Sequence, residues 1–310
     1  MTTILRPLST SELLDRTFYL YRNNFGLFVG IAAVPQTGVL ALHLVDSALW
    51  LRVWIPSRGL RVALFYVASF VAVQISHAAT AAAVSNLHLE RGADIWSAYK
   101  GVGRSLFRVI GISLVAFAMP FVLAVIVGVV AMFVSLGLLA AFGVFNDGAV
   151  AGAGMRVTVL MLIVIAAPLL AIRWWVRWAL VVPATVLEGG GLGTSLRRSK
   201  WLTQGRHWRI FVVFILVLTL TWAVSVLLQT PFYSMVKWGD LLRAGQITTS
   251  AAIVSSAGNF LSQSLVSPLL TIAFTLIYYD ERVRREGFDL QLMISKLEQA
   301  PAPAAMPSIS

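Results

Sequence analysis

Residues 211–236 read FVVFILVLTLTWAVSVLLQTPFYSMV, a run without a charged side chain. A transmembrane helix needs about 20 predominantly apolar residues to cross the hydrocarbon core of a bilayer. We therefore predict a membrane-spanning helix over 209–236. Five further apolar runs predict spans over about 25–51, 60–87, 109–141, 157–187 and 251–280. The third run is long for one span and short for a hairpin of two. The sequence thus predicts an all-α integral membrane protein with six transmembrane helices.

The overall composition agrees with this prediction. Of the 310 residues, 58% are hydrophobic and 12% are charged, whereas soluble domains carry about 25% charged residues. The chain has no cysteine, which excludes disulfides, thiolate catalysis and cysteine-ligated zinc. Its net charge of +11 is typical of a membrane protein whose cytoplasmic loops face anionic lipid, and we favour that explanation over nucleic-acid binding. No cofactor is expected.

Lysine and arginine are distributed unevenly between the two sides of the predicted bundle. One side comprises the N-terminus, the loops at 88–108 and 188–209 and the C-terminal tail, and it carries 16 of these residues, whereas the other side carries 6. Cytoplasmic loops of membrane proteins are enriched in lysine and arginine. We therefore predict a multi-pass protein of the cell inner or plasma membrane with both termini in the cytoplasm. Residues 1–295 are predicted to form its single membrane domain.

Three short amphipathic helices are predicted on the cytoplasmic side, over about 9–24, 93–107 and 192–205. The first begins with a capping-box pattern, in which Ser9 is followed three residues later by Glu12. Each leads into an odd-numbered span, so the chain divides into three units of one interfacial helix and two spans. The alternative is that any six-span protein carries aromatic and basic residues at its cytoplasmic rim. In both cases we expect these helices to lie among anionic lipid headgroups.

The stretch IRWWVRWALVVPATVLEGG, residues 172–190, places Arg173 and Arg177 inside the fourth predicted span. They are four residues apart and share one face of a helix. A charge at the bilayer centre costs at least about 2.5–3.5 kcal/mol. One interpretation places both arginines at the cytoplasmic shoulder of the span, where they bind phosphate headgroups. The other places them in a polar cavity open to the cytoplasm, paired with Glu188, Glu90 or an anionic substrate.

Other polar residues recur at similar depth in the even-numbered spans. Gln74 and His77 lie in the second span, and Gln263 lies in the sixth. If the three units are pseudo-equivalent, these side chains face one axis together with the two arginines. The alternative is that each makes an ordinary interhelical hydrogen bond, worth about 0.6 kcal/mol. The candidate cavity or headgroup contacts are therefore Gln74, His77, Gln263, Arg173, Arg177, Glu188 and Glu90.

No segment carries a convincing catalytic pattern. Ser97-x-x-Lys100 matches an S-x-x-K motif, but its partner motifs are missing, so we interpret the match as chance. The glycine-rich GGGLGTS at 189–195 lacks the Gly-Lys-Ser/Thr ending of a phosphate loop. A helix that begins there can hold a headgroup phosphate, although we favour a flexible hinge. The four histidines show no metal-binding spacing, and we do not expect an enzyme.

The sequence IYYDERVRREGFDLQLM at 277–293 leaves the last span with charges of alternating sign. We predict a helical exit supported by local ion pairs four residues apart, such as Glu281 with Arg285. Residues 296–310 are rich in proline, alanine and serine and are predicted to be a disordered tail.

Three cytoplasmic segments together resemble a known protein family. They are LSTSELLDRTFYLYRNNF (8–25), RWALVVPATVLEGGGLGTSLRRSKWLTQGRHWRIF (177–211) and YYDERVRREGFDL (278–290). The family consists of bacterial six-span proteins labelled glycerophosphoryl diester phosphodiesterase membrane domain. In the members that give the family its name, the membrane module is fused to a separate phosphodiesterase barrel. No segment of this chain matches that barrel, so the resemblance implies a stand-alone membrane module.

Three functions are compatible with these patterns. The first is a non-catalytic membrane module that scaffolds, anchors or regulates a membrane or cytoplasmic protein partner, and it agrees best with the missing chemistry and the basic cytoplasmic rim. The second is a small transporter or lipid-handling permease with a polar cavity around Arg173 and Arg177. The third is a membrane-embedded enzyme acting on a lipid headgroup, which requires a cluster of carboxylates or histidines.

Overall fold

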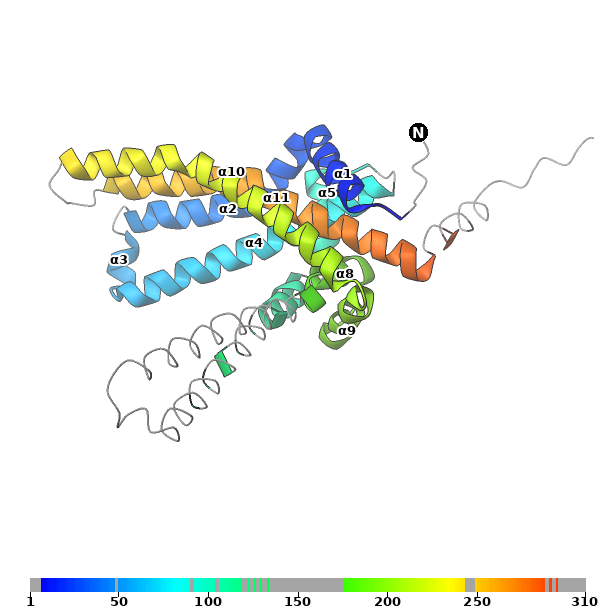
Figure 1. The fold of residues 1–310 in the computed structure, drawn as a ribbon. Helices are drawn as coiled ribbons and strands as arrows, with labels where there is room; N and C mark the ends of the chain where they lie inside the picture. Colours follow the sequence, from blue (N-terminus) through cyan, green and yellow to red (C-terminus); the bar gives the residue numbers. More distant parts are fainter. Residues whose placement is uncertain are drawn as a thin grey trace, which may run out of the picture.

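A computed structural model of the chain describes residues 7–47, 50–89, 92–103, 106–116, 176–242 and 249–287, with a few single positions beyond them. Every regular element within these ranges is a helix, which confirms the predicted all-α class (Figure 1). Four of these helices are long and apolar enough to cross a membrane. The described part of the chain is therefore a helical bundle with four candidate spans.

The four long helices correspond to four of the predicted spans. They are α2 (Phe25–Ser47), α4 (Arg58–His88), α10 (His207–Leu242) and α11 (Thr249–Glu286). Helix α2 covers residues 25–47 of the first predicted span, and the short helix α3 (Trp50–Trp54) is described after it. The predicted spans 109–141 and 157–187 lie largely outside the described residues. Apart from single positions, the structure describes the start of the first, as the helix Leu106–Ala116, and the end of the second, as the segment 176–188.

Four short helices gather at one end of the bundle. They are α1 (Thr10–Asn23), α5 (Ile95–Gly103), α8 (Val181–Glu188) and α9 (Leu192–Thr203). Figure 1 shows all four at the end opposite to α3. We call this end, formed by α1, α5, α8, α9 and the last turns of α11, the basic end. The three short helices predicted from the sequence therefore exist, and they lie on the same side of the bundle.

Local sequence signals explain where two of these short helices begin. The Ser9 hydroxyl accepts a hydrogen bond from the Glu12 N–H at 3.2 Å, and the Glu12 carboxylate accepts one from the Ser9 N–H at 2.7 Å. This reciprocal pair confirms the predicted capping box of α1. At α5, the Asp94 carboxylate accepts a hydrogen bond from the Trp96 N–H at 3.2 Å. Each cap satisfies a backbone donor that the helix itself leaves without a partner.

The described end of the fourth predicted span is broken into two pieces. Residues 176–178 are helical, a turn follows at Ala179 and Leu180, and α8 then begins at Val181. Pro183 explains the break, because it has no N–H to donate to the Ala179 carbonyl oxygen and its ring crowds that oxygen. In the first turn of α8 the missing donor costs little, since the first N–H groups of any helix lack an intrahelical partner.

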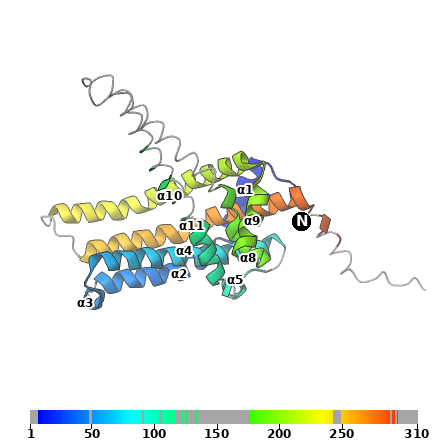
Figure 2. The same cartoon turned by 90° about the horizontal axis from the view of Figure 1, so that it is seen from below.

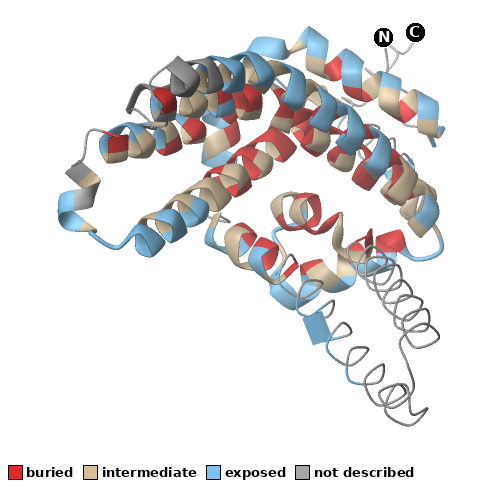
Figure 3. Cartoon of the chain, turned by 60° about the vertical axis from the view of Figure 1, so that its left-hand side comes forward, coloured by how far each residue is buried: buried red, intermediate tan, exposed pale blue. Residues whose placement is uncertain are grey.

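Helix α11 is the centre of the bundle. It packs against α10, α2 and α4, and towards the basic end it also contacts α1, α8 and α9. Figure 2 shows the long helices running side by side, and Figure 3 shows buried residues concentrated where they meet. On α4 the small residues Ala78, Ala79, Ala81 and Ala83 are all fully buried. The absence of bulky side chains on this stretch allows neighbouring helices to approach closely.

Candidate functional site

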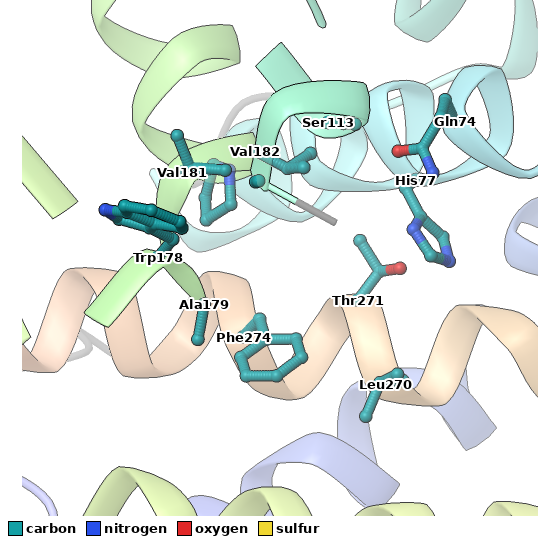
Figure 4. Close-up of a pocket in the computed structure, with 12 residues that line it drawn as sticks. Gln74, His77, Ser113, Trp178, Ala179, Val181, Val182, Leu270, Thr271 and Phe274 are labelled. Carbon is teal, nitrogen blue, oxygen red and sulfur yellow. The ribbon is translucent and has the colours of Figure 1, made fainter. Parts of the chain in front are cut away.

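A small cavity lies between four segments of the bundle. Gln74 and His77 reach it from α4, Ser113 from the helix Leu106–Ala116, and Thr271 from α11 (Figure 4). Its volume is about 80 Å³. The other described residues that line it are mostly apolar: Ala116, Trp178, Ala179, Val181, Val182, Pro183, Leu270 and Phe274.

Several polar atoms around this cavity have no partner among the described residues. The exposed fractions of Gln74, Ser113 and Thr271 are 2%, 0% and 5%, and Gln74 Oε1, Ser113 Oγ and Thr271 Oγ1 make no hydrogen bond there. A buried polar atom left without a partner costs about 1–3 kcal/mol. Because a single water needs roughly 10–15 Å³, the cavity has room for several waters or for a small polar group that satisfies these atoms.

The cavity lies deep in the bundle rather than at its charged end. His77 is eleven residues from the end of α4 at His88, and Thr271 is nine residues before Asp280 on α11. At about 1.5 Å per residue, these separations correspond to roughly 16 Å and 14 Å. The hydrocarbon core of a bilayer is about 30 Å thick, so a charged end at the membrane surface places the cavity near mid-depth.

The structure brings only part of the predicted polar set to this cavity. Gln74 and His77 line it. Gln263 is half-buried on α11, two helical turns before the lining residue Leu270, and does not line the cavity itself. Arg177 does not line it either, although the two residues that follow Arg177 do. Among the described residues, the polar groups that converge here are therefore amide, imidazole and hydroxyl groups, and the Arg177 guanidinium is not one of them.

The backbone of Arg177 helps to hold α9 in place. Arg177 is half-buried, and its carbonyl oxygen accepts a hydrogen bond from the Ser199 hydroxyl of α9 at 2.9 Å. This bond connects the chain before α8 to the helix after it. Arg173 and Glu90, the other predicted members of the set, lie outside the described residues, so their pairing stays a prediction.

Glu188 connects α8 to α9 and α11. Its Oε1 atom lies 2.8 Å from Arg198 Nε, and its carboxylate also accepts a hydrogen bond from the Tyr278 hydroxyl. Arg198 pairs in addition with Glu286. Burial alone would lower the pKa of Arg198, but hydrogen bonds and charge attraction from Glu188 and Glu286 outweigh burial and raise this pKa. One permanently charged guanidinium in the middle of α9 therefore holds the ends of α8 and α11.

A second set of ion pairs lies at the end of α11. Asp280 and Glu281 are only 3% and 0% exposed. Arg209 Nη1 lies 2.5 Å from Asp280 Oδ2 and 3.1 Å from Glu281 Oε1, and Arg209 Nη2 donates to the Leu8 carbonyl oxygen at 2.7 Å. The Leu8 N–H in turn donates to Asp280 Oδ1 at 2.6 Å. We call the following groups the buried ion cluster: Asp280, Glu281, Arg206, Arg209, Arg284 and the Leu8 backbone.

The partners of Glu281 differ from the predicted one. The sequence predicts that Glu281 pairs with Arg285 one turn later on the same helix. Arg285 donates instead to the Gln204 carbonyl oxygen between α9 and α10. Glu281 is fully buried and meets Arg206 and Arg209 from the start of α10, at 3.3 Å and 3.1 Å. A buried carboxylate is costly without an opposite charge nearby, and Arg206 and Arg209 supply that charge from outside α11.

The buried ion cluster has the features of a structural element. Its carboxylates are occupied by guanidinium and backbone donors, which leaves no free base. Within the described ranges, no group of three or more histidines or acidic residues is placed to hold a metal ion. The Ser97 hydroxyl of the S-x-x-K match donates to the Asp94 carbonyl oxygen at 2.7 Å and accepts from the Asp94 N–H at 3.1 Å, so it serves the start of α5.

Comparison of the chain with protein-family models, with curated proteins and with solved structures finds no match in any of the three. Sequence reasoning did not identify Ser113 and Thr271 as cavity residues. Single hydroxyls occur throughout membrane helices and commonly bond to their own backbone, so nothing in the sequence distinguishes these two.

Proposed function

We propose that this protein is a non-catalytic integral membrane module that anchors or regulates a protein partner at the cytoplasmic face of the membrane. The observation that carries this proposal is the assembly of α1, α8 and α9 around the end of α11. Ion pairs of Arg198 join α9 to α8 and α11, and a hydrogen bond from the Leu8 N–H to Asp280 ties the start of α1 to α11. A surface that is already ordered loses little conformational freedom on binding, which favours recognition. The occupied state of the buried carboxylates supports a binding role rather than a catalytic one.

We further propose that the chain crosses the membrane six times, as three units, with both termini in the cytoplasm. Two units are supported by the described helices, since α1 precedes α2 and α4, and α9 precedes α10 and α11. The third would consist of α5 and the predicted spans 109–141 and 157–187. The excess of lysine and arginine supports a cytoplasmic basic end. A stand-alone module also agrees with the resemblance to the glycerophosphoryl diester phosphodiesterase membrane domain.

The basic end presents exposed cations beside exposed aromatic rings. Lys100 Nζ lies 5.7 Å from the ring centroid of Trp96, whose side chain is 66% exposed. Arg22 of α1 is exposed as well. Such a surface is complementary to an acidic protein surface, and its outer parts suit anionic lipid headgroups.

Reversing two exposed charges at the basic end should release the protein partner. We expect Arg22→Glu combined with Lys100→Glu to reduce the amount of co-purified partner at least about tenfold, because like charges then face each other across the interface. The measurement is affinity purification from native membranes in mild detergent, followed by quantitative mass spectrometry.

Arg58→Glu is the matched control for this experiment. Arg58 is also exposed, but it begins α4 at the end opposite to the basic end. Its reversal should leave the co-purified proteins unchanged. The proposal fails if the wild-type chain is recovered alone, or if the control releases the partner to the same extent.

The cavity favours a second candidate function, a small permease or lipid-handling protein. Gln74, Ser113 and Thr271 offer neutral hydrogen-bonding groups at mid-depth, where a polar group that crosses the bilayer needs them. The apolar wall around Trp178 and Phe274 suits the attached hydrocarbon part of such a molecule.

Removing two of these polar groups should slow lipid transfer between leaflets. We expect Gln74→Leu combined with Thr271→Val to reduce the rate at least about tenfold, since two hydrogen bonds of roughly 1 kcal/mol each are lost. The rate is measured with a fluorescent phospholipid in vesicles that contain the purified protein. Thr230→Val is the control, because the Thr230 hydroxyl is exposed and bonds to its own helix at 2.7 Å. Equal rates for the cavity variant and the control, or no transfer above protein-free vesicles, would reject this function.

A further inference from the structure

The N-terminus of α9 has no side-chain cap. Residues Gly189 to Gly191 precede the helix, and the N-cap residue Gly191 has no side chain that can accept a hydrogen bond. The Ser195 N–H donates to the Gly191 carbonyl oxygen at 3.0 Å, so the three helical N–H groups before it have no intrahelical partner. Together with the helix dipole, such N–H groups favour an anion.

A pocket of about 330 Å³ lies at this helix end. Gly190, Thr194 and Ser195 line it at the start of α9, and Arg197 lines it two residues after Ser195. Ser195 is only 2% exposed, and its hydroxyl makes no hydrogen bond to any described residue. An oxygen of a bound anion would accept a hydrogen bond from this hydroxyl. The unpartnered Ser195 hydroxyl is therefore a second observation, besides the helix terminus, that indicates a ligand.

Gly190 leaves open the space next to the two hydroxyls of the pocket. A Cβ atom at this position would lie 2.8 Å from Thr194 Oγ1 and 3.1 Å from Ser195 Oγ, which is closer than ordinary contact. The Thr194 hydroxyl is held in place because it donates to the Gly191 carbonyl oxygen at 2.7 Å. The absence of a side chain at Gly190 therefore gives a ligand oxygen access to this corner of the pocket.

The charges around the pocket are predominantly positive. Arg197 is exposed and forms no ion pair with the described residues. Arg108 donates to the Gly189 carbonyl oxygen at 2.7 Å, directly beside the pocket. Glu188, the one carboxylate among the described residues that line the pocket, is paired with Arg198 at 2.8 Å. An anion entering the pocket therefore meets guanidinium groups and a carboxylate that is already neutralised.

We propose that this pocket binds a phosphate monoester group, with the first N–H groups of α9, the Ser195 hydroxyl and the Arg197 guanidinium as its donors. A phosphate monoester has several strong acceptor oxygens and close to two negative charges, which matches this number and kind of donors. Small-molecule sites begin at about 300 Å³, so the pocket has room for a phosphate together with part of the group attached to it. An anionic lipid headgroup and a soluble phosphate ester share this chemistry.

Binding to the full chain in phosphatidylcholine nanodiscs tests this proposal. Phosphatidic acid within the disc is the lipid probe and inorganic phosphate is the soluble probe, and each affinity is derived from the rise of the thermal unfolding midpoint. We expect Arg197→Gln to weaken binding at least about tenfold and Ser195→Ala to weaken it about threefold. A response to phosphatidic acid alone identifies a lipid headgroup as the source, and a response to inorganic phosphate identifies a soluble one.

Lys200→Gln is the matched control variant. It removes one exposed positive charge from the same helix, but Lys200 does not line the pocket. It should change either affinity by less than about twofold. Equal weakening by Lys200→Gln and Arg197→Gln would show a general charge effect and overturn the proposal. The absence of any stabilisation by either probe would overturn the proposal as well. That result would leave the proposed binding of a protein partner at the basic end unaffected.

Discussion

Replacing Arg209 with methionine should lower the free energy of unfolding by about 3–5 kcal/mol, because it leaves buried carboxylates with too few cations. The guanidinium of Arg209 contacts Asp280, Glu281 and the Leu8 carbonyl oxygen at once, at 2.5 Å, 3.1 Å and 2.7 Å. Methionine keeps most of the apolar stem and removes the charge and all three hydrogen-bonding contacts. The measurement is the unfolding midpoint of the purified protein in detergent, followed by tryptophan fluorescence against denaturant or temperature.

Two further variants compare the buried cluster with a partly buried pair within one helix. Arg282→Met removes a pair with Glu286 one turn away on the same helix, at 3.0 Å. Glu286 keeps Arg198 as a partner, so no carboxylate loses its only cation and the cost should be less than about 1 kcal/mol. Adding Glu281→Gln to Arg209→Met should restore part of the lost stability, because the variant then holds one uncompensated charge fewer. If Arg209→Met destabilises no more than Arg282→Met, the cluster does not stabilise the fold in the way argued.

Replacing Gly258 with valine should force α10 and α11 apart and cost about 1–3 kcal/mol or more. A Cβ atom at Gly258 would lie 2.7 Å, 2.8 Å and 2.9 Å from Cγ, Cδ2 and Cβ of Phe232 on α10. Two of these three atoms lie close to the Phe232 backbone, so a simple rotation of the ring cannot make room. The same unfolding measurement detects the loss, and a labelled pair of positions on the two helices detects their separation.

Gly38→Val is the matched control, because Gly38 also lies within a long apolar helix but has open space where its Cβ atom would be. It should change the free energy of unfolding by less than about 0.5 kcal/mol. In the Gly258→Val background, Phe232→Ala should recover stability, since it removes the atoms that clash. Equal effects of Gly258→Val and Gly38→Val would contradict the close approach of the two helices at this point.

Most of the helices could be predicted from the sequence because their signals are local. An uncharged run such as 211–236 can only be buried in a membrane or a large core, and its length predicts α10 directly. The capping box of Ser9 and Glu12 involves residues three apart, so the start of α1 can also be recognised without any tertiary information. The sequence also predicted that three short helices lie on the side of the bundle that is rich in lysine and arginine. The structure places α1, α5 and α9 together at one end (Figure 1).

The candidate site could be predicted only in part. Gln74 and His77 stand out as polar residues within an apolar run, and both line the cavity. Ser113 and Thr271 reach the same cavity from other helices, and their hydroxyls resemble many others in the sequence. The glycine-rich turn before α9 could be recognised as a helix start, but the pocket beside it requires Arg197 and Ser195 to face the same space.

For the described residues, sequence alone therefore determined which segments are helical and which end of the bundle is rich in positive charge, because hydrophobicity, charge and capping act between residues close together in the chain. Tertiary structure alone decided that Glu281 meets Arg206 and Arg209 rather than Arg285, and that Glu188 meets Arg198. A buried charge takes whichever opposite charge the packing of its neighbours brings within reach, and that packing depends on contacts between residues far apart in the sequence.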